Sequence, residues 1–367
     1  MPHWKSIHIE RFRRLENLRL DDLGTVNLLV GKNNSGKTSV LEAIAIAANP
    51  MHLGSWIDTA WKREIKSART PVAEVVKWLF PEAAKFTEPG TFQSSLKLSA
   101  CQADGDTWGI DVEAKESLIY GDASQDAPTL FGESSATPLL ELELHNWRKN
   151  ADGQTVMTAK TGFGIALAAP VRIEPQPQRA GWTAQFITPV SHRTETEQVA
   201  NLSKALNEQR RSEIVGLLKS FMPHVDSVEI ISLDPRNPRV RIQGNGHGSQ
   251  PLSVQGDGLR RALVLATSVS FASDGFLLID EIETALHPDV LESVMRFLVK
   301  ACRERNVQLF VTTHSLEAVD AILAGMDGAY GDISAYHLPP QGSSLPVYRL
   351  GGKSIQSMRS ESGLDLR

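Results

Sequence analysis

Alternation of apolar and polar residues predicts two groups of β-strands. The first lies near the N-terminus, where residues 4–9 and 18–20 alternate on either side of a turn. The second covers residues 91–120 and 139–157, and each half contains an Asp-Gly turn sequence between two alternating runs. Because alternating runs joined by short turns pair as hairpins, this group is expected to form an antiparallel sheet. The segment between its halves, residues 121–138, is poor in large apolar residues and is expected to be a mobile loop.

Apolar residues at helical spacing predict helices in other parts of the chain. The spacing extends over residues 39–48, 51–86 and 195–222. Within the last of these, residues 207–212 interrupt the apolar stripe, which indicates either a turn between two helices or an exposed face. A short hairpin is expected to follow, around a proline-containing turn at residues 234–238.

Three further runs are apolar without alternation, which is typical of strands buried on both faces of a parallel sheet. They are residues 26–30, 276–279 and 309–311. Together with the helices they predict an α/β core, and the alternating region predicts an antiparallel sheet appended to it.

The first buried run ends at a glycine-rich loop that is suited to bind phosphates. Residues 31–38 read Gly-Lys-Asn-Asn-Ser-Gly-Lys-Thr and match the pattern G-x-x-x-x-G-K-[ST] between a strand and a helix. That order directs backbone N–H groups at an anion, so Lys37 is expected to reach the β- and γ-phosphates and Thr38 to bind Mg²⁺. These flanks disfavour a chance match. The residues expected to bind ATP are Gly31, Asn33, Asn34, Ser35, Gly36, Lys37, Thr38 and Ser39.

Two carboxylates follow the second buried run. Asp280 and Glu281 come directly after four apolar residues, at the carboxyl end of a predicted parallel strand, where ligands bind in such sheets. We expect Asp280 to hold Mg²⁺ and Glu281 to polarise the water that attacks ATP. The third run leads to His314, which is placed to hydrogen-bond a γ-phosphate. Capping carboxylates and a structural histidine are the alternatives, and the combination with the glycine-rich loop disfavours both.

A second stretch of small residues precedes a helix predicted over residues 262–270. The N-terminus of that helix makes the stretch a second anion site. Because one chain already binds its γ-phosphate at residues 31–38, the second site is expected to serve ATP bound by another copy. The prediction is a head-to-tail homodimer that encloses two ATP molecules. The contact residues expected from this stretch are Ser253, Gly256, Asp257 and Gly258.

A basic and aromatic cluster near the N-terminus, Arg11-Phe12-Arg13-Arg14, allows two interpretations. In the first, Arg13 faces the nucleotide and binds ATP. In the second, the arginines form a solvated turn and Phe12 lies in the core. The pattern alone favours neither.

Composition limits the classes of protein that remain. The chain has 367 residues, enough for one large domain with an insertion or for two domains, and a formal net charge of −5. This balance gives no overall basic field for nucleic acid, although a local basic patch is compatible with it. The two cysteines supply neither a disulfide framework nor a zinc site, and no apolar run is long enough for a membrane span or a signal peptide. We expect a cytoplasmic protein without a membrane partner.

Four motifs, taken in this order, resemble the ABC-type AAA ATPases of the RecF/SMC/OLD branch. They are residues 31–38, Gly-Asp-Gly-Leu-Arg-Arg at 256–261, Ile-Asp-Glu-Ile-Glu-Thr-Ala-Leu-His-Pro at 279–288 and Thr-Thr-His-Ser at 312–315. The resemblance implies ATP hydrolysis, with catalytic roles for Lys37, Glu281 and His314. It also places His287 and Pro288, in a continuation typical of OLD-like members, in a loop that communicates across the dimer.

Two departures from that branch bear on function. Residues 254–258 read Val-Gln-Gly-Asp-Gly rather than Leu-Ser-Gly-Gly-Gln, so the register of Ser253 against the family serine stays open. The residues after Ser315 are too few, and too poor in acidic metal ligands, for the TOPRIM nuclease domain of OLD nucleases. The chain also lacks the heptads of an SMC coiled coil.

We therefore predict a P-loop NTPase of ABC type with an appended antiparallel β-sheet and a helical insertion. Residues 1–193 and 244–367 are expected to form the ATPase core, and residues 194–243 the helical insertion and a hairpin. The predicted function is ATP hydrolysis that opens and closes a dimer and regulates a separate effector, such as a nuclease or toxin, in bacterial anti-phage defence. The alternatives are a RecF-like DNA-repair ATPase with DNA as partner, and a nucleotide-gated scaffold with slow turnover.

Overall fold

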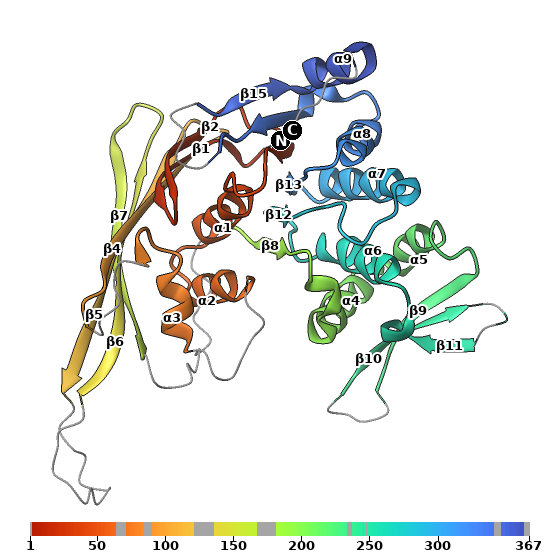
Figure 1. Ribbon diagram of the computed structural model, residues 1–367, viewed down its shortest axis with the longest axis horizontal. Coiled ribbons are helices and arrows are strands. Elements are labelled where there is room, and N and C mark those ends of the chain that lie inside the picture. The colour runs from red at the N-terminus through yellow and green to blue at the C-terminus, as the bar shows by residue number, and fades with distance from the viewer. Residues whose placement is uncertain are drawn as a thin grey trace, which may run out of the picture. The chain divides into compact units, whose positions relative to one another are not determined.

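The computed structural model describes residues 2–63, 71–83, 90–120, 136–166, 181–232, 237–244, 246, 248–340 and 346–362. The chain divides into two compact units. Unit 1 consists of Met1–Lys5, Leu20–Leu41 and Trp182–Arg367, and unit 2 of Ser6–Arg19 and Glu42–Gly181. The predicted α/β class is confirmed, with a mostly parallel sheet in unit 1 and an antiparallel sheet in unit 2 (Figure 1). The division into segments 1–193, 194–243 and 244–367 stays a prediction.

Unit 1 is built on a six-stranded sheet with the order β15-β14-β3-β13-β12-β8. Five neighbouring strands are parallel, and β15 (Tyr348–Gly351) pairs antiparallel at one edge. The parallel strands are β3 (Val26–Val30), β8 (Ala184–Ile187), β12 (Phe276–Ile279), β13 (Gln308–Thr312) and β14 (Ile333–His337). Every residue of β3, β12 and β13 is buried, which confirms the strands predicted from the continuous apolar runs.

The register of the central strands aligns their carboxyl ends. Leu29 of β3 lies opposite Thr312 of β13, and Ile279 of β12 lies opposite Val311. The segments that follow these strands therefore leave the sheet at one edge. This edge receives the glycine-rich loop, the two carboxylates and the histidine singled out in the sequence.

Helices in unit 1 contribute to the same buried core as the sheet. Three of these helices come from the C-terminal half of the chain and are labelled in Figure 1: α6 (Asp257–Ser268), α7 (Pro288–Glu304) and α8 (Leu316–Gly325). α4 (Glu195–Asn207) ends before α5 (Arg211–Leu218), so the interruption predicted near residue 209 is a turn between two helices. The last helix is α9 (Gly352–Ser362).

A small antiparallel sheet in unit 1 has the order β11-β10-β9. β9 (Val225–Ile231) and β10 (Arg239–Gly244) form the predicted hairpin. β11 (Gly248–Pro251) was not predicted, because its glycine, serine and glutamine residues have little strand propensity and only the partner strand β10 makes it a strand.

Unit 2 contains a six-stranded sheet with the order β2-β1-β4-β5-β6-β7. Its strands are β1 (Trp4–Phe12), which begins in unit 1, β2 (Leu15–Leu20), β4 (Gln93–Gln102), β5 (Thr107–Tyr120), β6 (Ala136–Lys149) and β7 (Thr155–Ala166). The pairing of β4 to β7 confirms the predicted antiparallel sheet. The loop expected over 121–138 falls outside the described residues up to 135, and residues 136–138 belong to β6.

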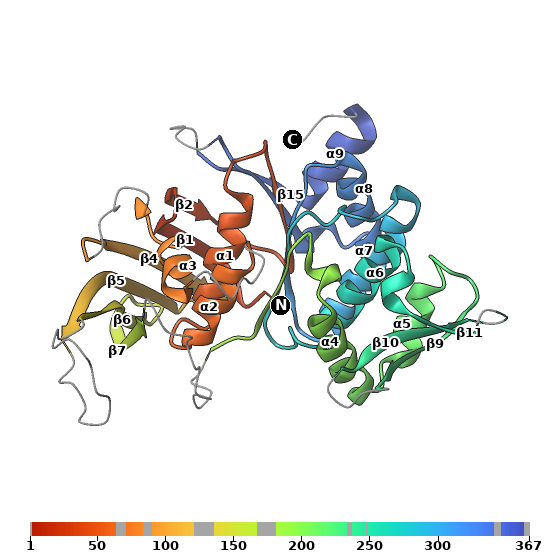
Figure 2. The same ribbon diagram turned by 60° about the horizontal axis from the view of Figure 1, so that its bottom comes forward.

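Short helices accompany the sheet of unit 2, as Figure 2 shows. α1 (Lys37–Ala48) continues into unit 2 from unit 1 and is followed by α2 (Leu53–Trp61) and α3 (Val72–Lys77). The helical region expected over residues 51–86 is therefore two short helices, with residues 64–70 and 84–89 outside the described part. Trp56 of α2 stacks on Phe80, and Phe80 meets Phe92 edge-on just before β4.

One predicted boundary is wrong. The helix expected from residue 262 begins at Asp257, with Gly256 as its N-cap residue in an extended conformation. An acidic residue in the first turn stabilises a helix N-terminus, and glycine is accepted at the N-cap. The small residues therefore start α6 rather than precede it.

Candidate functional site

The glycine-rich loop connects β3 to α1 through three residues with positive φ angles. Gly31 has a φ of +142° and Gly36 of +91°, conformations that residues with a Cβ atom rarely adopt. A Cβ atom on Gly31 would lie 2.7 Å from the carbonyl oxygen of Leu338. Asn34, with a φ of 63°, lies between the two glycines in the left-handed region. The backbone therefore turns tightly from the strand into the helix.

Lys37, the first residue of α1, lies over this loop. Its Nζ atom donates hydrogen bonds to the carbonyl oxygens of Gly31 at 2.7 Å and of Lys32 at 3.0 Å. The side chain is buried, and this desolvation lowers the pKa of Lys37 from its ordinary value, opposed by the charges of three carboxylates. The ammonium group thus lies inside the loop, where the negative charge of a triphosphate would be placed.

Hydrogen bonds join the start of α1 to the ends of β12 and β13. Thr38 Oγ1 donates to Asp280 Oδ2 at 2.9 Å, and Thr312 Oγ1 donates to Asp280 Oδ1 at 2.6 Å. The fold therefore brings together two residues that lie far apart in the sequence. A hydroxyl oxygen next to a carboxylate suits Mg²⁺, which prefers hard oxygen ligands and takes few of them from the protein. Thr38 and Asp280 fit the magnesium site predicted for them.

Glu281 has a backbone conformation that is uncommon for a residue with a side chain, with a φ of 47°. Its N–H donates to Thr312 Oγ1 at 2.8 Å. Its Oε2 accepts a hydrogen bond from Thr284 Oγ1 at 3.2 Å. The chain thus turns sharply after β12, where Thr312 holds the backbone of Glu281 and Thr284 bonds its carboxylate.

His314 follows β13 and lies beside Glu283. The backbone N–H of His314 donates to Glu283 Oε1 at 3.0 Å, and the ring Nδ1 is 3.3 Å from the same oxygen. The His314 side chain is 49% exposed, whereas that of Glu283 is 16% exposed. The carboxylate therefore orients the imidazole and leaves about half of it open to a ligand.

The predicted second anion site lies at the start of α6. Gly256 is the N-cap residue, and Asp257 and Gly258 belong to the first turn. Ser253 and Gly256 are exposed. A Cβ atom on Gly258 would lie 3.0 Å from the carbonyl oxygen of Ala285, so this turn lies close to the segment that follows the two carboxylates.

Asp257 is engaged by two arginines. Its carboxylate accepts hydrogen bonds from Arg193 at 2.8 Å and from Arg260 at 3.1 Å. The hydrogen bond from Arg193 is the main cause that holds the pKa of Asp257 below its ordinary value. The carboxylate therefore ties the start of α6 to the segment after β8.

Arg13 pairs with a buried carboxylate within unit 2. Its Nε lies 2.7 Å from Oε2 of Glu42, whose side chain is fully buried, and Arg63 Nε lies 2.6 Å from the other oxygen. Phe12 is buried, and Arg11 is exposed. These positions agree with a turn that covers a core phenylalanine, and the contact of Arg13 with ATP stays a prediction.

Three residues of the site were not among the predicted contacts. Thr312 and Glu283 occur in the motifs that carry the resemblance, but no spacing rule shows that they bond Asp280 and His314. Arg261 is fully buried and contacts the backbone of both predicted carboxylates. It too occurs in one of those motifs, at the end of residues 256–261, but no spacing rule shows which groups it bonds.

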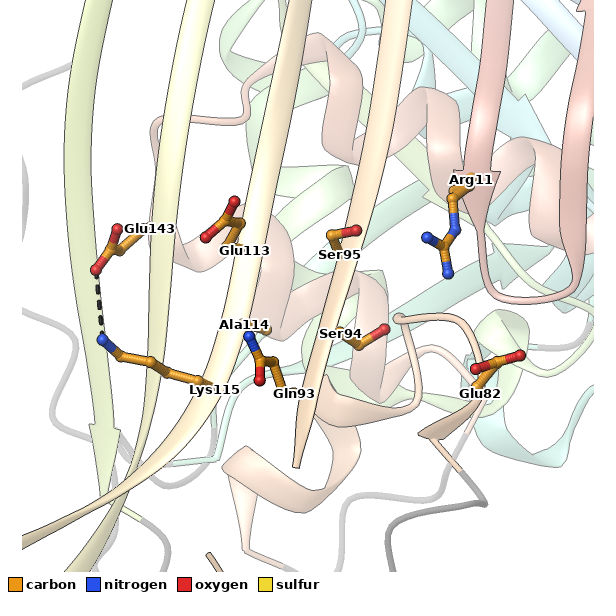
Figure 3. Close-up of a pocket in the computed structure, with 9 residues that line it drawn as sticks. All are labelled: Arg11, Glu82, Gln93, Ser94, Ser95, Glu113, Ala114, Lys115 and Glu143. Carbon is orange, nitrogen blue, oxygen red and sulfur yellow. Dashed lines mark ion pairs between the residues drawn. The ribbon is translucent and has the colours of Figure 1, made fainter. Parts of the chain in front are cut away.

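A separate cavity of about 330 Å³ lies on the antiparallel sheet of unit 2 (Figure 3). It is lined by Arg11, Glu82, Gln93, Ser94, Ser95, Glu113, Ala114, Lys115 and Glu143. Lys115 Nζ lies 3.6 Å from Glu143 Oε1, so one of its two cations is already paired. The other cation, Arg11, shares the cavity with two further carboxylates, Glu82 and Glu113, and this balance of charge is unsuited to a triphosphate. None of the predicted site residues lines this cavity.

Two family models match the chain. Residues 172–320 match a family described as "AAA domain, putative AbiEii toxin, Type IV TA system", and residues 4–88 match one described as "AAA ATPase domain". Between them, the matched regions contain the glycine-rich loop, the carboxylates that follow β12 and the histidine that follows β13.

Three curated relatives are similar over most of the chain. It is 24% identical to the OLD nuclease of Thermus scotoductus, over 85% of this chain and 58% of that protein. It is 23% identical to the DNA replication and repair protein RecF of Heliobacterium modesticaldum, over 89% of this chain and 96% of that protein. The chain belongs to the ABC-type AAA ATPases of the RecF/SMC/OLD branch. An ATP/GTP phosphatase of Helicobacter pylori is 22% identical over 89% of this chain and 90% of that protein.

This membership confirms the predicted family, and with it that the chain is an ATP-binding enzyme of the ATPase class. The RecF/SMC/OLD-branch ATPase described here spans little more than half of the length of the OLD nuclease. Within its described residues, no helix combines the length and the apolar character needed to cross a bilayer.

Proposed function

We propose that this ATPase hydrolyses ATP at composite sites shared by two copies of the chain, and that the cycle regulates a separate effector in bacterial anti-phage defence. The observation that carries the hydrolytic site is the bridging carboxylate of Asp280. It bonds Thr38 of the glycine-rich loop through one oxygen and Thr312, next to the segment of His314, through the other. These two hydrogen bonds support a site in which the glycine-rich loop, the proposed metal ligands and the segment of His314 act together at one edge of the sheet.

Each group at this edge has a distinct proposed role. The loop N–H groups and the Lys37 ammonium bind the β- and γ-phosphates. Thr38 and Asp280 hold Mg²⁺, which when bound neutralises charge on the phosphate oxygens. Glu281 accepts a proton from the attacking water, and His314 donates a hydrogen bond to the γ-phosphate.

The start of α6 supports a second copy as the partner. It presents small residues and a helix N-terminus, and Val254 beside it is 68% exposed. Val190, 54% exposed, precedes the turn whose Arg193 bonds Asp257. Exposed apolar side chains next to an anion site favour a protein surface that brings a phosphate with it.

Dimerisation can be tested in a variant that hydrolyses slowly. With MgATP, Glu281→Gln is expected to double in mass by light scattering, because bound ATP persists and holds two copies together. Adding Gly256→Asp is expected to restore the monomer by placing a negative charge where the partner's triphosphate docks. The position tolerates a side chain, since its φ is −61° and no atom lies within 4 Å of the added Cβ.

Gly331→Asp is the matched control, because no atom lies within 4 Å of its Cβ either. It is expected to leave the dimer intact. A Glu281→Gln protein that stays monomeric with MgATP would contradict the composite site. A dimer that persists in the Gly256→Asp variant would show that the start of α6 is not part of the interface.

Glu283→Gln is expected to lower the rate of ATP hydrolysis about 10-fold, as loss of a group that orients a functional side chain typically does. The neutral amide keeps the size of the side chain but attracts the ring of His314 less strongly than the carboxylate at 3.3 Å. Steady-state phosphate release measures the effect.

His314→Ala supplies the comparison for that variant. If Glu283 acts through the ring, Glu283→Gln added to His314→Ala lowers the rate no further. An additional loss in the double variant would show that Glu283 acts elsewhere.

The proposed link to an effector rests on relatives rather than on geometry. A matched family description names a toxin of a toxin–antitoxin system, and one relative is a nuclease. Purification of tagged Glu281→Gln protein from its own host, followed by mass spectrometry, is expected to recover a nuclease or toxin that the wild type loses on hydrolysis. Recovery of the same proteins with a Lys37→Met variant would contradict nucleotide-dependent regulation.

A RecF-like role in DNA repair is the second candidate, because the relative named RecF is matched over 96% of its length. Stimulation of ATP hydrolysis by double-stranded DNA, falling steeply as salt is added, would favour this role over regulation of an effector.

A further inference from the structure

Arg261 is a completely buried arginine whose hydrogen bonds go to main-chain carbonyls. It lies one turn into α6 and donates to the carbonyl oxygens of Asp280 at 3.1 Å and Glu281 at 3.3 Å. A third hydrogen bond goes to the carbonyl oxygen of Thr188, directly after β8. Within the described part of the chain no carboxylate forms an ion pair with it. One guanidinium therefore joins α6 to the segments after two strands of the sheet.

One of these contacts holds Glu281, the residue with an unusual backbone conformation. Glu281 has a φ of 47°, in the left-handed region that side chains seldom adopt. Thr312 accepts from its N–H at 2.8 Å, and Arg261 donates to its carbonyl oxygen. Both ends of the residue are thus held, from β13 on one side and from α6 on the other. We expect that loss of either contact lets the backbone of Glu281 relax toward negative φ and so changes the direction of its carboxylate.

The stability of the fold does not by itself explain why a charged residue, Arg261, occupies this buried position. Desolvation lowers the pKa of Arg261 to about 10, opposed by the charges of Asp280, Glu281 and Glu283, so the group remains protonated at neutral pH. Buried ionic groups are often replaced by apolar residues of similar volume without loss of stability. Five donors in a planar fork, however, let one side chain bind several carbonyl oxygens at once.

We propose that Arg261 is a positioning residue that couples the start of α6 to the orientation of Glu281. The inference rests on the proposed role of Glu281 in hydrolysis. The same helix begins at Gly256 and Asp257, where the proposed function docks the ATP of a second copy. A displacement of α6 by that ATP therefore reaches the Glu281 backbone of its own chain through Arg261. Each of the two sites then responds to occupancy of the other.

The test is Arg261→Met, which removes the donors and keeps most of the volume. The catalytic rate is expected to fall roughly 100-fold, as misplacement of a reacting group by about an ångström does. The dissociation constant for a fluorescent ATP analogue, measured at equilibrium, is expected to stay at the wild-type value, because Arg261 does not contact the glycine-rich loop. The catalytic rate of Arg261→Lys is expected to lie between those of the wild type and Arg261→Met, since an ammonium keeps the charge but lacks the planar fork of donors.

Arg210 provides a matched control. It is also buried, and it bonds Glu213, the carbonyl oxygen of Ala266 and Ser270 rather than the carboxylate segment. Arg210→Met is expected to lower the melting temperature without the loss of catalytic rate. An equal loss of rate in Arg210→Met and Arg261→Met would show a merely structural role and overturn the proposal.

A double-mutant cycle separates this proposal from the proposed function. If Arg261 acts through Glu281, Arg261→Met added to Glu281→Gln slows single-turnover hydrolysis no further. Further slowing in the double variant, or a wild-type rate in Arg261→Met, overturns the positioning role alone. A wild type no faster than Glu281→Gln would instead reject the assigned role of Glu281, whatever Arg261 does.

Discussion

Glu281→Gln is expected to lower the steady-state rate of ATP hydrolysis by roughly 100- to 10,000-fold, the range that a positioned general base contributes. The variant keeps the side-chain shape and the hydrogen bond from Thr284, but it removes the carboxylate that accepts a proton from water. Binding of ATP should persist, because the loop and Lys37 are unchanged. Phosphate release and equilibrium nucleotide binding, measured on the same preparation, check both statements.

Glu304→Gln is the control for the loss of a carboxylate. This residue ends α7 on the surface, where its nearest cation, on Lys300, is 3.9 Å away and the pair is largely exposed. We expect it to leave the rate unchanged. A wild type that releases phosphate no faster than Glu281→Gln would favour the slow-turnover scaffold over the hydrolytic cycle.

Lys37→Met is expected to abolish stabilisation of the protein by MgATP. In the wild type, ATP at 100 times its dissociation constant raises the free energy of unfolding by about 2.7 kcal/mol, because the ligand binds only the folded state. The variant lacks the cation that lies over the loop, 2.7 Å from the Gly31 carbonyl oxygen, and should bind the triphosphate too weakly to be stabilised. Thermal melts with and without MgATP measure the difference.

Lys32→Met tests whether any positive charge near the loop is enough. The Lys32 side chain is exposed, and only its carbonyl oxygen contacts Lys37. The variant is expected to keep most of the shift in melting temperature. A shift of wild-type size in Lys37→Met would contradict the placement of ATP at this loop.

Local sequence patterns were enough to predict many of the strands and helices of this ATPase, and its glycine-rich loop. The glycine-rich loop was predicted together with its flanking strand and helix, because an apolar run, the pattern G-x-x-x-x-G-K-[ST] and apolar residues at helical spacing lie next to one another in the chain. The same holds for β12 and β13 and for the antiparallel sheet of unit 2. In each case the period of apolar residues reports which faces are buried, and burial is what makes the element stable.

The motifs assigned Thr38 and Asp280 to one magnesium site, but only the tertiary structure decided which contacts join those pieces. The order β3-β13-β12 brings Thr38 to Asp280, but the order of parallel strands depends on crossovers that no local pattern encodes. β11 exists only because β10 pairs with it, and α6 starts earlier than its apolar stripe indicates. In the sequence, Arg261 is the last residue of the motif at 256–261, and nothing in that motif indicates what its side chain contacts. Its burial against two carbonyl oxygens of the catalytic segment arises from packing between α6 and the sheet, and contacts between distant residues can be assigned only once the chain is folded.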